Sequence, residues 1–408
     1  MMKDIKIVVC GCGQRGRTLT EHVLTRIKGI KIAGLCDTGF IERAEGVKNT
    51  IKKEFNIDTK VYSDYKLMFD EVKPDAVFVA TGWEYHVEVA TYAMKKGIAV
   101  AMEVGGAYCV EDCYKLINTY EETKTPFMFM ENCCFNRDEL LATSVARKGL
   151  LGEIVYCHGA YGHDLRDEVS YGKINGHYRF NNYLNRNCDN YPTHNLGPIA
   201  KLLNINRGNR MVSLTSMSSK SAGLRDYVNE REDLAVLKGV EFKQGDIVRT
   251  LIKCENGELI SLCLDTTLPR FYSREFTVRG TKGMYMQDND MMLVEGEYNE
   301  NVSQLDFFKQ NHNSAKKYEQ YLPEFWKDVP QEILDAGHGG MDYFLFVAFF
   351  DALRNGTEMP IDVYDAASWM CITYLSEISI KNGGALVEIP DFTNGKYKTR
   401  KPKDVVEF

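Results

Sequence analysis

A glycine-rich turn near the start of the chain places the strongest constraint on its fold. Gly11, Gly13 and Gly16 follow the β-branched run 5–9 and precede a stretch that predicts a helix over about 17–28. Between a strand and a helix, this spacing permits a tight turn, close approach of the backbone to a ligand, and close packing of the helix on the strand. The N-terminus of such a helix attracts anionic groups. The turn therefore predicts a doubly wound sheet that holds the pyrophosphate of a dinucleotide.

Asp37 indicates which dinucleotide is expected. It ends the predicted second strand, 30–36, and follows Gly16 by about 20 residues. A carboxylate in this place accepts hydrogen bonds from the ribose diol of the adenosine and repels a 2′-phosphate. The expected cofactor is therefore NAD rather than NADP.

The pattern of predicted elements changes near residue 132. Before it, strands and helices alternate, as in a parallel sheet covered on both faces. After it, a helix at 137–148 and a strand at 153–161 lead to a helix at 191–203 and a series of β-branched strands, with a hairpin turn at Asn256-Gly257. The further strands expected before residue 132 are 76–80, 98–102 and 127–130, and those after it are 211–217, 247–253, 259–265 and 275–279.

The predicted fold class is α/β with two domains. Residues 1–131 are expected to form an NAD-binding Rossmann domain with a doubly wound parallel sheet. Residues 132–408 are expected to form an α+β substrate and oligomerisation domain with an open, mostly antiparallel sheet. Two late helices within about 340–381 are expected to brace the first domain, and segment 296–336 is expected to be an irregular surface loop.

Composition argues against several classes of protein. A net charge of −7 gives no support to a nucleic-acid surface. No apolar run approaches the roughly 18 residues that a membrane span needs, and the start of the chain lacks the pattern of an export signal. The twelve cysteines are scattered, and no second pair at zinc-finger spacing accompanies Cys109 and Cys113, so reduced thiols, no metal and a cytoplasmic location are expected.

Two pairs of polar rings in the second domain predict proton-transfer chemistry. Tyr191 and His194 are three residues apart at the start of the predicted helix, so one face can present both. Tyr161 and His163 are two apart at the end of a predicted strand, so they face the same way. We expect these rings beside the nicotinamide and the substrate. The alternative is a helix cap with a buried, hydrogen-bonded histidine.

Two further polar segments follow strands of the first domain. Trp83 and His86 come after strand 76–80, and Glu103 comes after strand 98–102. Ligands of open α/β sheets bind at the carboxyl ends of the strands. These side chains are therefore cofactor-site candidates, although Trp83 and His86 could instead pack between the two domains.

Together these motifs resemble the Gfo/Idh/MocA oxidoreductases. Most of that family has Glu-Lys-Pro after the 98–102 strand, whereas this chain has Val104 at the lysine position and Gly105 at the proline position. Among relatives without the lysine, the chain is most similar to glycoside hydrolase family 109, the NAD-dependent α-N-acetylgalactosaminidases. Asn195 departs from the glycine usual there, which implies an altered substrate preference. The matching stretches are 83–86, 103–104, 131–134, 159–166, 185–187, 191–194, 203–208 and 337–342.

The resemblance implies a set of site residues. The residues implied to line the NAD site are Gly11, Gly13, Arg15, Gly16, Asp37, Trp83, His86, Glu103, Val104, Asn132 and Tyr191. The residues implied to contact substrate are Glu131, Tyr161, Arg179, Tyr191, His194 and Tyr272, with His163 beside them. Tyr272 could also be an ordinary strand aromatic.

The activity implied is NAD-dependent cleavage of α-N-acetylgalactosaminides. In this chemistry C3 of the sugar is oxidised, the C1–C2 elimination expels the aglycone, water adds, and C3 is reduced again. His194 is our hypothesis for the base at the C3 hydroxyl, with Tyr161, His163 and Tyr191 as further catalytic candidates. The alternatives are a sugar or cyclitol dehydrogenase, a 3-ketoglycoside-forming oxidoreductase, or a non-catalytic sugar and nucleotide sensor. The expected partners are a small glycoside and, through the second sheet, another copy of the chain.

Overall fold

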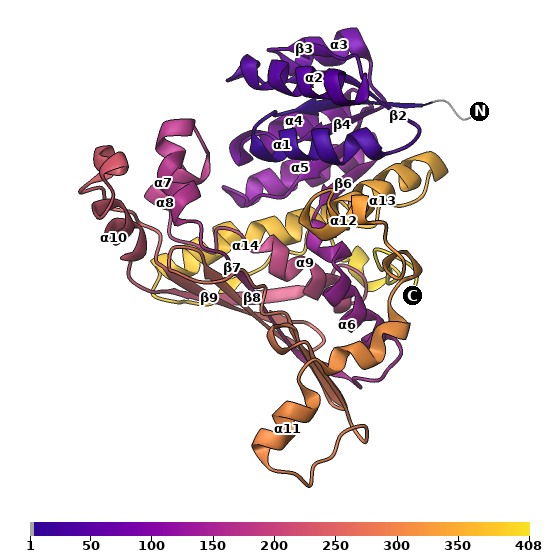
Figure 1. Cartoon of the computed structure of the whole chain (residues 1–408), viewed down its shortest axis with the longest axis vertical. Helices are drawn as coiled ribbons and strands as arrows, with labels where there is room; N and C mark the ends of the chain where they lie inside the picture. The colour runs from indigo at the N-terminus through magenta and orange to yellow at the C-terminus, as the bar shows by residue number, and fades with distance from the viewer. Residues whose placement is uncertain (1–3) are drawn as a thin grey trace. The chain divides into compact units, whose positions relative to one another are not determined.

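The structure, a computed structural model, describes residues 4–408, and the chain divides into two compact units (Figure 1). Unit 1 comprises the residues up to Gly105 together with Val110–Asn136 and Asp328–Ala367. Unit 2 comprises Gly106–Cys109, Arg137–Lys327 and Ser368–Phe408. Each unit is therefore built from separate stretches of the chain.

Unit 1 contains the predicted parallel sheet. Its strand order is β3-β2-β1-β4-β5-β6, and every pairing is parallel. All residues of β4, β5 and β6 are buried, as expected of parallel strands covered on both faces. The strands are β1 Ile5–Cys10, β2 Ile30–Cys36, β3 Lys60–Tyr62, β4 Ala76–Val79, β5 Ala99–Glu103 and β6 Phe127–Met130.

Helices connect these strands and cover the sheet. One late helix, α13, packs against the sheet through Phe346, whose ring centroid lies 5.1 Å from that of Phe78 on β4. The helices of unit 1 are α1 Gln14–His22, α2 Ile41–Phe55, α3 Tyr65–Val72, α4 Trp83–Lys95, α5 Val110–Thr123, α12 Gln331–Leu334 and α13 Met341–Asn355. The boundary between the units in the chain falls within α14, Val363–Lys381.

Unit 2 contains an eight-stranded sheet in the order β13-β12-β11-β7-β10-β9-β8-β14. Within this sheet, as far as the structure describes it, β10 and β7 are the only neighbouring strands that run parallel. The expectation of an open, mostly antiparallel sheet is therefore confirmed. Buried and exposed residues alternate along β9, which is typical of a sheet with one covered face. The strands are β7 Ile154–Gly162, β8 Met211–Ser218, β9 Ile247–Cys254, β10 Leu259–Asp265, β11 Thr277–Gly280, β12 Gly283–Met286, β13 Met291–Val294 and β14 Val387–Glu388.

Helix α9 covers one face of this sheet, because its residues Asn195 and Ile199 pack directly on Gly159 of β7. Figure 1 shows α7, α8 and α10 gathered at one end of the sheet and α11 beyond the other. The helices of unit 2 are α6 Arg137–Arg147, α7 Arg166–Asn175, α8 Arg179–Asn185, α9 Thr193–Leu202, α10 Gly223–Asn229 and α11 Gln304–Asn311.

Two expectations from the sequence are corrected. The first helix begins at Gln14, inside the glycine turn, and ends at His22 before a short 3₁₀ helix, Leu24–Arg26. Segment 296–336 is not an irregular loop, because it holds α11, α12 and two 3₁₀ helices, Ser314–Tyr321 and Glu324–Trp326. Its elements are short and are fixed by contacts such as the hydrogen bonds of Ser314 with the backbone of Met292 on β13.

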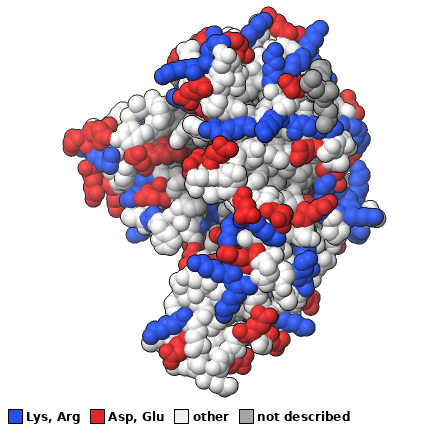
Figure 2. Space-filling model, turned by 45° about the vertical axis from the view of Figure 1, so that its right-hand side comes forward, with Lys and Arg blue, Asp and Glu red and all other residues white. Residues whose placement is uncertain are grey.

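No helix among residues 4–408 has the length and apolar character that would let it cross a membrane. On the face drawn in Figure 2, lysine and arginine side chains alternate with aspartate and glutamate side chains. A mixed surface of this kind is consistent with the net charge of −7.

Candidate functional site

The glycine turn of unit 1 has the shape of a phosphate cradle. A Cβ on Gly11 would lie 2.4 Å from the carbonyl oxygen of Ala80, and one on Gly16 would lie 1.9 Å from that of Gly11. A Cβ on Gly13 would meet only Nη1 of Arg43, at 4.0 Å. Packing within the protein thus explains Gly11 and Gly16 but not Gly13. A ligand that approaches the backbone at Gly13 does explain it.

The start of α1 suits a negatively charged ligand. Among residues 4–408, no side chain accepts a capping hydrogen bond at Gly13, the N-cap residue of α1. The first N–H groups of a helix are left without intrahelical partners, and the helix dipole favours an anion there. This turn and Asp37 together fit the pyrophosphate and ribose of NAD.

Asp37 lies directly after β2 and is held in place by two backbone donors. Its Oδ2 accepts a hydrogen bond from the N–H of Cys12 at 3.0 Å, and its Oδ1 accepts one from the N–H of Phe40 at 3.0 Å. The carboxylate is therefore fixed beside the glycine turn. Each oxygen keeps a second lone pair, so the group can still accept the hydroxyls of a ribose.

The segments that follow β1, β4 and β5 lie at one edge of the sheet. The strand register pairs Cys10 with Val79 and Val79 with Met102, so the three carboxyl ends are adjacent. Trp83 and His86 open helix α4 at this edge, and both are buried. The structure therefore brings Trp83, His86 and Glu103 to the edge where open sheets bind ligands.

His86 is a neutral imidazole, and one of its two ring nitrogens bonds to the backbone. Its Nε2 lies 2.9 Å from the carbonyl oxygen of Thr81, so this nitrogen carries the hydrogen. Burial lowers the pKa of His86 to about 4. A Cβ on Gly105 would approach Trp83 to 3.0 Å and Nδ1 of His86 to 3.3 Å. The small residue at position 105 thus leaves room around these two rings.

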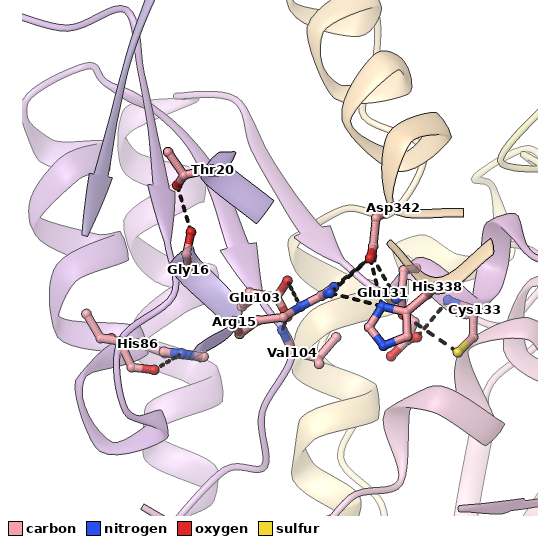
Figure 3. A network of polar contacts seen from close by, with 12 residues as sticks. Arg15, Gly16, Thr20, His86, Glu103, Val104, Glu131, Cys133, His338 and Asp342 are labelled. Carbon is pink, nitrogen blue, oxygen red and sulfur yellow. Dashed lines mark hydrogen bonds and ion pairs between the residues drawn. The ribbon is translucent and has the colours of Figure 1, made fainter. Parts of the chain in front are cut away.

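Arg15 lies at the centre of a network of polar contacts (Figure 3). Its Nε donates to Oε1 of Glu103 at 3.0 Å, and its two terminal nitrogens donate to the carboxylate of Asp342 at 3.0 and 2.7 Å. Asn132 donates from Nδ2 to Oδ1 of Asp342 at 2.8 Å, and Nδ1 of His338 lies 2.7 Å from Oδ2. The family resemblance implied that Arg15 lines the NAD site, and in the structure its guanidinium is engaged by these carboxylates.

The two carboxylates of this network differ in their electrostatics. Burial is the main reason why the pKa of Glu103 is raised above its usual range, although Arg15 opposes this. Burial also acts on Asp342, but Arg15 and His338 hold its pKa well below the usual range. Asp342 is therefore the firmly ionised member of the pair.

The other unit 1 candidates are buried near this network. Val104 is 4 % exposed and donates its N–H to Oε2 of Glu103 at 3.2 Å. Glu131 is fully buried, and its Oε1 accepts the N–H of Cys133 at 3.1 Å. An apolar side chain at position 104 cannot move a proton, which separates this site from one that uses a lysine there.

In unit 2 the four predicted rings form one cluster. The ring centroid of Tyr161 lies 4.5 Å from that of Tyr191 and 5.5 Å from that of His194. Tyr191 and His194 are 4.7 Å apart, and the hydroxyl of Tyr161 lies 3.3 Å from Nδ1 of His163. Burial lowers the pKa of His163, and Arg179 adds to this effect. The cluster therefore presents a neutral imidazole and two phenols together.

Arg179 and Tyr272 border the cluster. The guanidinium of Arg179 lies 4.7 Å from the ring centroid of Tyr191 and pairs with Glu168 at 2.8 Å. Tyr272 is 46 % exposed, and its ring lies 5.1 Å from that of His163. All the candidates of unit 2 therefore lie in one neighbourhood, with the cation of Arg179 beside Tyr191 and the exposed phenol of Tyr272 beside His163.

Asn195 has a packing role that the sequence did not indicate. Its Nδ2 donates to the carbonyl oxygen of Gly159 at 3.0 Å, and its side chain is buried. The bond ties the first turn of α9, which carries His194, to the strand that carries Tyr161. The sequence had led us to expect an effect of Asn195 on the sugar, but its side chain faces the strand.

His338 is a candidate that sequence reasoning missed. Its side chain is 53 % exposed, and it lies in the run Gly337–Gly340, in which all four residues have positive φ. A non-glycine residue in this conformation is uncommon and needs support from its surroundings. The signal in the sequence was the glycine context around a histidine, Gly-His-Gly-Gly, four residues before Asp342.

Comparisons with known proteins agree with this geometry. Residues 135–399 match the family model described as glycosyl hydrolase 109, C-terminal domain, and residues 5–130 match the oxidoreductase family, NAD-binding Rossmann fold. An α-N-acetylgalactosaminidase of Tannerella forsythia is 38 % identical over 96 % of this chain and 87 % of its own length. A glycosyl hydrolase family 109 protein of Parabacteroides distasonis is also 38 % identical, over 96 % and 88 %.

The fold also matches solved structures. An oxidoreductase from Agrobacterium radiobacter in complex with NAD⁺, L-tartaric acid and magnesium superposes with a TM-score of 0.66 at 17 % identity, covering 95 % of this chain and 99 % of that one. At this identity the likeness concerns the fold alone. It agrees with the parallel sheet of unit 1 followed by the mostly antiparallel sheet of unit 2.

Proposed function

The chain belongs to glycosyl hydrolase family 109, and we propose on that premise that it hydrolyses α-N-acetylgalactosaminides with the help of NAD. The observation that carries the proposal is the cluster of Tyr161, His163, Tyr191 and His194. The elimination of the aglycone and the addition of water each require proton transfers. A cluster of several groups that can hold or move protons suits such a reaction. Val104 in place of a lysine supports the same choice over an ordinary sugar dehydrogenase.

The residues of unit 1 would hold the cofactor by its pyrophosphate and by the ribose of its adenosine. The backbone at Gly13 and the start of α1 suit the pyrophosphate, and Asp37 suits the adenosine ribose. Bound there, NAD would supply the acceptor for a hydride from C3 of the sugar and, once reduced, the donor that restores it. Trp83, His86 and Asn132 are proposed to line the remainder of the cofactor site.

His194 is proposed to accept the proton of the C3 hydroxyl. It lies in the first turn of α9, and the bond between Asn195 and Gly159 fixes that turn on β7. Oxidation at C3 makes the C2 proton acidic. Tyr161 and His163 are proposed to accept that proton and to stabilise the enolate, because burial and Arg179 keep His163 neutral and able to act as a base.

Breaking the C1–O bond also requires a proton for the leaving oxygen, and water must lose one when it adds. His338 is our candidate for this exchange, because its imidazole is half exposed and held by an ionised carboxylate. Arg179 and Tyr272 are proposed to contact the sugar, through charge and through an exposed ring, and Glu131 to complete the site.

The proposal is tested by turnover of an aryl α-N-acetylgalactosaminide, followed at the absorbance of the aryl alcohol and at that of NADH. We expect release of aryl alcohol over many turnovers with no net NADH, because the hydride is returned in each cycle. NADH that accumulates in proportion to sugar oxidised, without aryl release, would make the protein a dehydrogenase instead. NAD binding without turnover of any glycoside would favour a sensor.

We further propose that the protein works in a reducing compartment such as the cytoplasm and that it pairs with a second copy. Most of the twelve cysteines are buried in the described part of the chain, as is usual for reduced thiols that pack as small hydrophobic groups. The uncovered face of the unit 2 sheet exposes Met217 and Leu251 on neighbouring strands, which supports pairing through this face. Sedimentation of the wild type and of a Leu251→Lys variant tests the pairing: a monomeric wild type contradicts it.

A further inference from the structure

His338 has a backbone conformation that its surroundings must impose. Residues Gly337, His338, Gly339 and Gly340 have φ of 109°, 43°, 66° and 94°. Three of the four are glycines, which adopt such angles freely, but His338 carries a Cβ that makes them costly. Strain of this kind persists only where neighbouring contacts fix it. The contacts of the imidazole therefore bear on what His338 does.

Asp342 is the residue that fixes the imidazole. Its carboxylate is fully buried and lies 2.7 Å, through Oδ2, from Nδ1 of His338 (Figure 3). Arg15 donates to both carboxylate oxygens, and Asn132 donates to Oδ1. The carboxylate is thus held from three sides by donors, two of which come from elements far away in the sequence.

This arrangement determines which imidazole nitrogen carries the hydrogen. An ionised carboxylate only accepts hydrogen bonds, so Nδ1 of His338 must donate to it. Nη1 of Arg15 also lies 3.1 Å from Nδ1, but a guanidinium only donates, so that approach is not a second hydrogen bond. Nε2 then keeps the lone pair. The charged groups that face the imidazole are Asp342 on α13 and Arg15 on α1, while Glu103 on β5 reaches only Arg15.

We infer that Asp342 is a positioning residue for His338: it fixes the Nδ1–H tautomer, presents Nε2 for proton transfer, and is itself held by Arg15 of the nucleotide-binding turn. The reaction that His338 serves rests on the proposed function. The tautomer does not, because it follows from the contacts alone. Since Arg15 stands two residues after Gly13, its ion pair joins Asp342 to the turn that is proposed to hold the pyrophosphate.

The test is ¹⁵N NMR of the full-length protein labelled at its eight histidines. His338→Gln, at an exposed position, identifies the His338 signals. At a pH where the imidazole is neutral, we expect the wild type to show the Nδ1–H tautomer with Nε2 unprotonated. In Asp342→Asn we expect this tautomer to lose its dominance. The amide has one acceptor oxygen in place of two, and its NH2 group can only donate, so it cannot accept from Arg15 and from Nδ1–H as the carboxylate does. We expect kcat to fall about 100-fold, with KM little changed.

Matched variants provide the controls. Asp335→Asn makes the same change at an exposed carboxylate three residues before His338, and it should leave both the tautomer and kcat unchanged. Arg15→Met should shift the tautomer in the same direction as Asp342→Asn, whereas Arg17→Met, at an exposed arginine paired with Glu21, should not. These comparisons separate the positioning effect from a general loss of charge.

A wild type with the Nε2–H tautomer overturns the inference, and so does a tautomer that Asp342→Asn leaves unchanged. If Asp342→Asn does not fold, the wild-type spectrum decides alone. If the wild type has the Nδ1–H tautomer, loses it in Asp342→Asn, and yet cleaves no aryl glycoside, the positioning stands and the proposed function fails. If the protein cleaves the glycoside but His338 has the Nε2–H tautomer, the proposed function stands and the positioning inference fails.

Discussion

Replacing Gly13 by alanine tests whether the glycine turn binds a pyrophosphate. Gly13 has φ of −65° and ψ of −173°, which alanine adopts without strain, and the new Cβ would meet only Arg43 at 4.0 Å. The free energy of unfolding should therefore change by less than about 1 kcal/mol, because the smaller entropy of the unfolded alanine chain opposes the poorer capping by alanine at the N-cap. The methyl group would, however, occupy the space that a phosphate needs to reach the first N–H groups of α1.

The expected loss of NAD affinity follows from the hydrogen bonds that the methyl group prevents. A hydrogen bond to a charged group contributes about 1.5–3 kcal/mol, so losing one raises the Kd for NAD about 10- to 100-fold. Calorimetric titration with NAD and thermal unfolding of the same preparations measure the two quantities. A Gly13→Ala variant with wild-type affinity would refute the reasoning.

Gly16→Ala is the matched comparison. Its Cβ would lie 1.9 Å from the carbonyl oxygen of Gly11, so the helix must shift on the strand. We expect this variant to lose about 3 kcal/mol of unfolding free energy, with or without NAD. The two glycines should thus separate ligand contact from packing, and equal destabilisation by both substitutions would contradict this assignment.

Three other predictions concern single side chains. Asp37→Ala should weaken NAD binding about 10-fold or more, measured by titration, because two acceptors for the ribose are lost; an unchanged Kd would remove Asp37 from the ribose site. His194→Ala should lower kcat about 100- to 10,000-fold with the thermal unfolding midpoint nearly unchanged; normal turnover would exclude His194 as the base. For His86, burial lowers the pKa from 6.5 to about 4, so between these pH values the unfolded chain takes up a proton that the folded chain refuses. Stability should therefore fall by about 3 kcal/mol as the pH drops from 7 to 4, and denaturation of His86→Gln should lack that part of the fall.

Local patterns in the sequence predict much of this fold. The glycine turn, the buried strand runs of unit 1 and the alternating strands of unit 2 all lie close to their expected bounds. The cluster of Tyr161, His163, Tyr191 and His194 was also expected, because each pair is close in sequence and the family resemblance brings the pairs together. Periodicity and short spacing suffice where the deciding contacts are local.

Contacts between distant residues could not be predicted in the same way. Arg15 and Asp342 are 327 positions apart, and nothing in either local pattern indicates that they form an ion pair. From the sequence, Asn195 was expected to affect substrate preference, because the family usually has glycine there. In the structure its side chain bonds to the carbonyl oxygen of Gly159, 36 positions earlier. Segment 296–336 lacks a long apolar period, because its short helices are fixed by tertiary contacts rather than by their own pattern.

The proposed mechanism is tested most directly at C2 of the sugar. Hydrolysis of an aryl α-N-acetylgalactosaminide in D₂O, with the product examined by NMR, reports whether the C2 proton leaves during turnover. The mechanism predicts deuterium at C2 of the released sugar, in step with aryl release and without net NADH. A product that keeps its C2 proton would mean that the C1–O bond breaks without elimination, and would contradict the central claim.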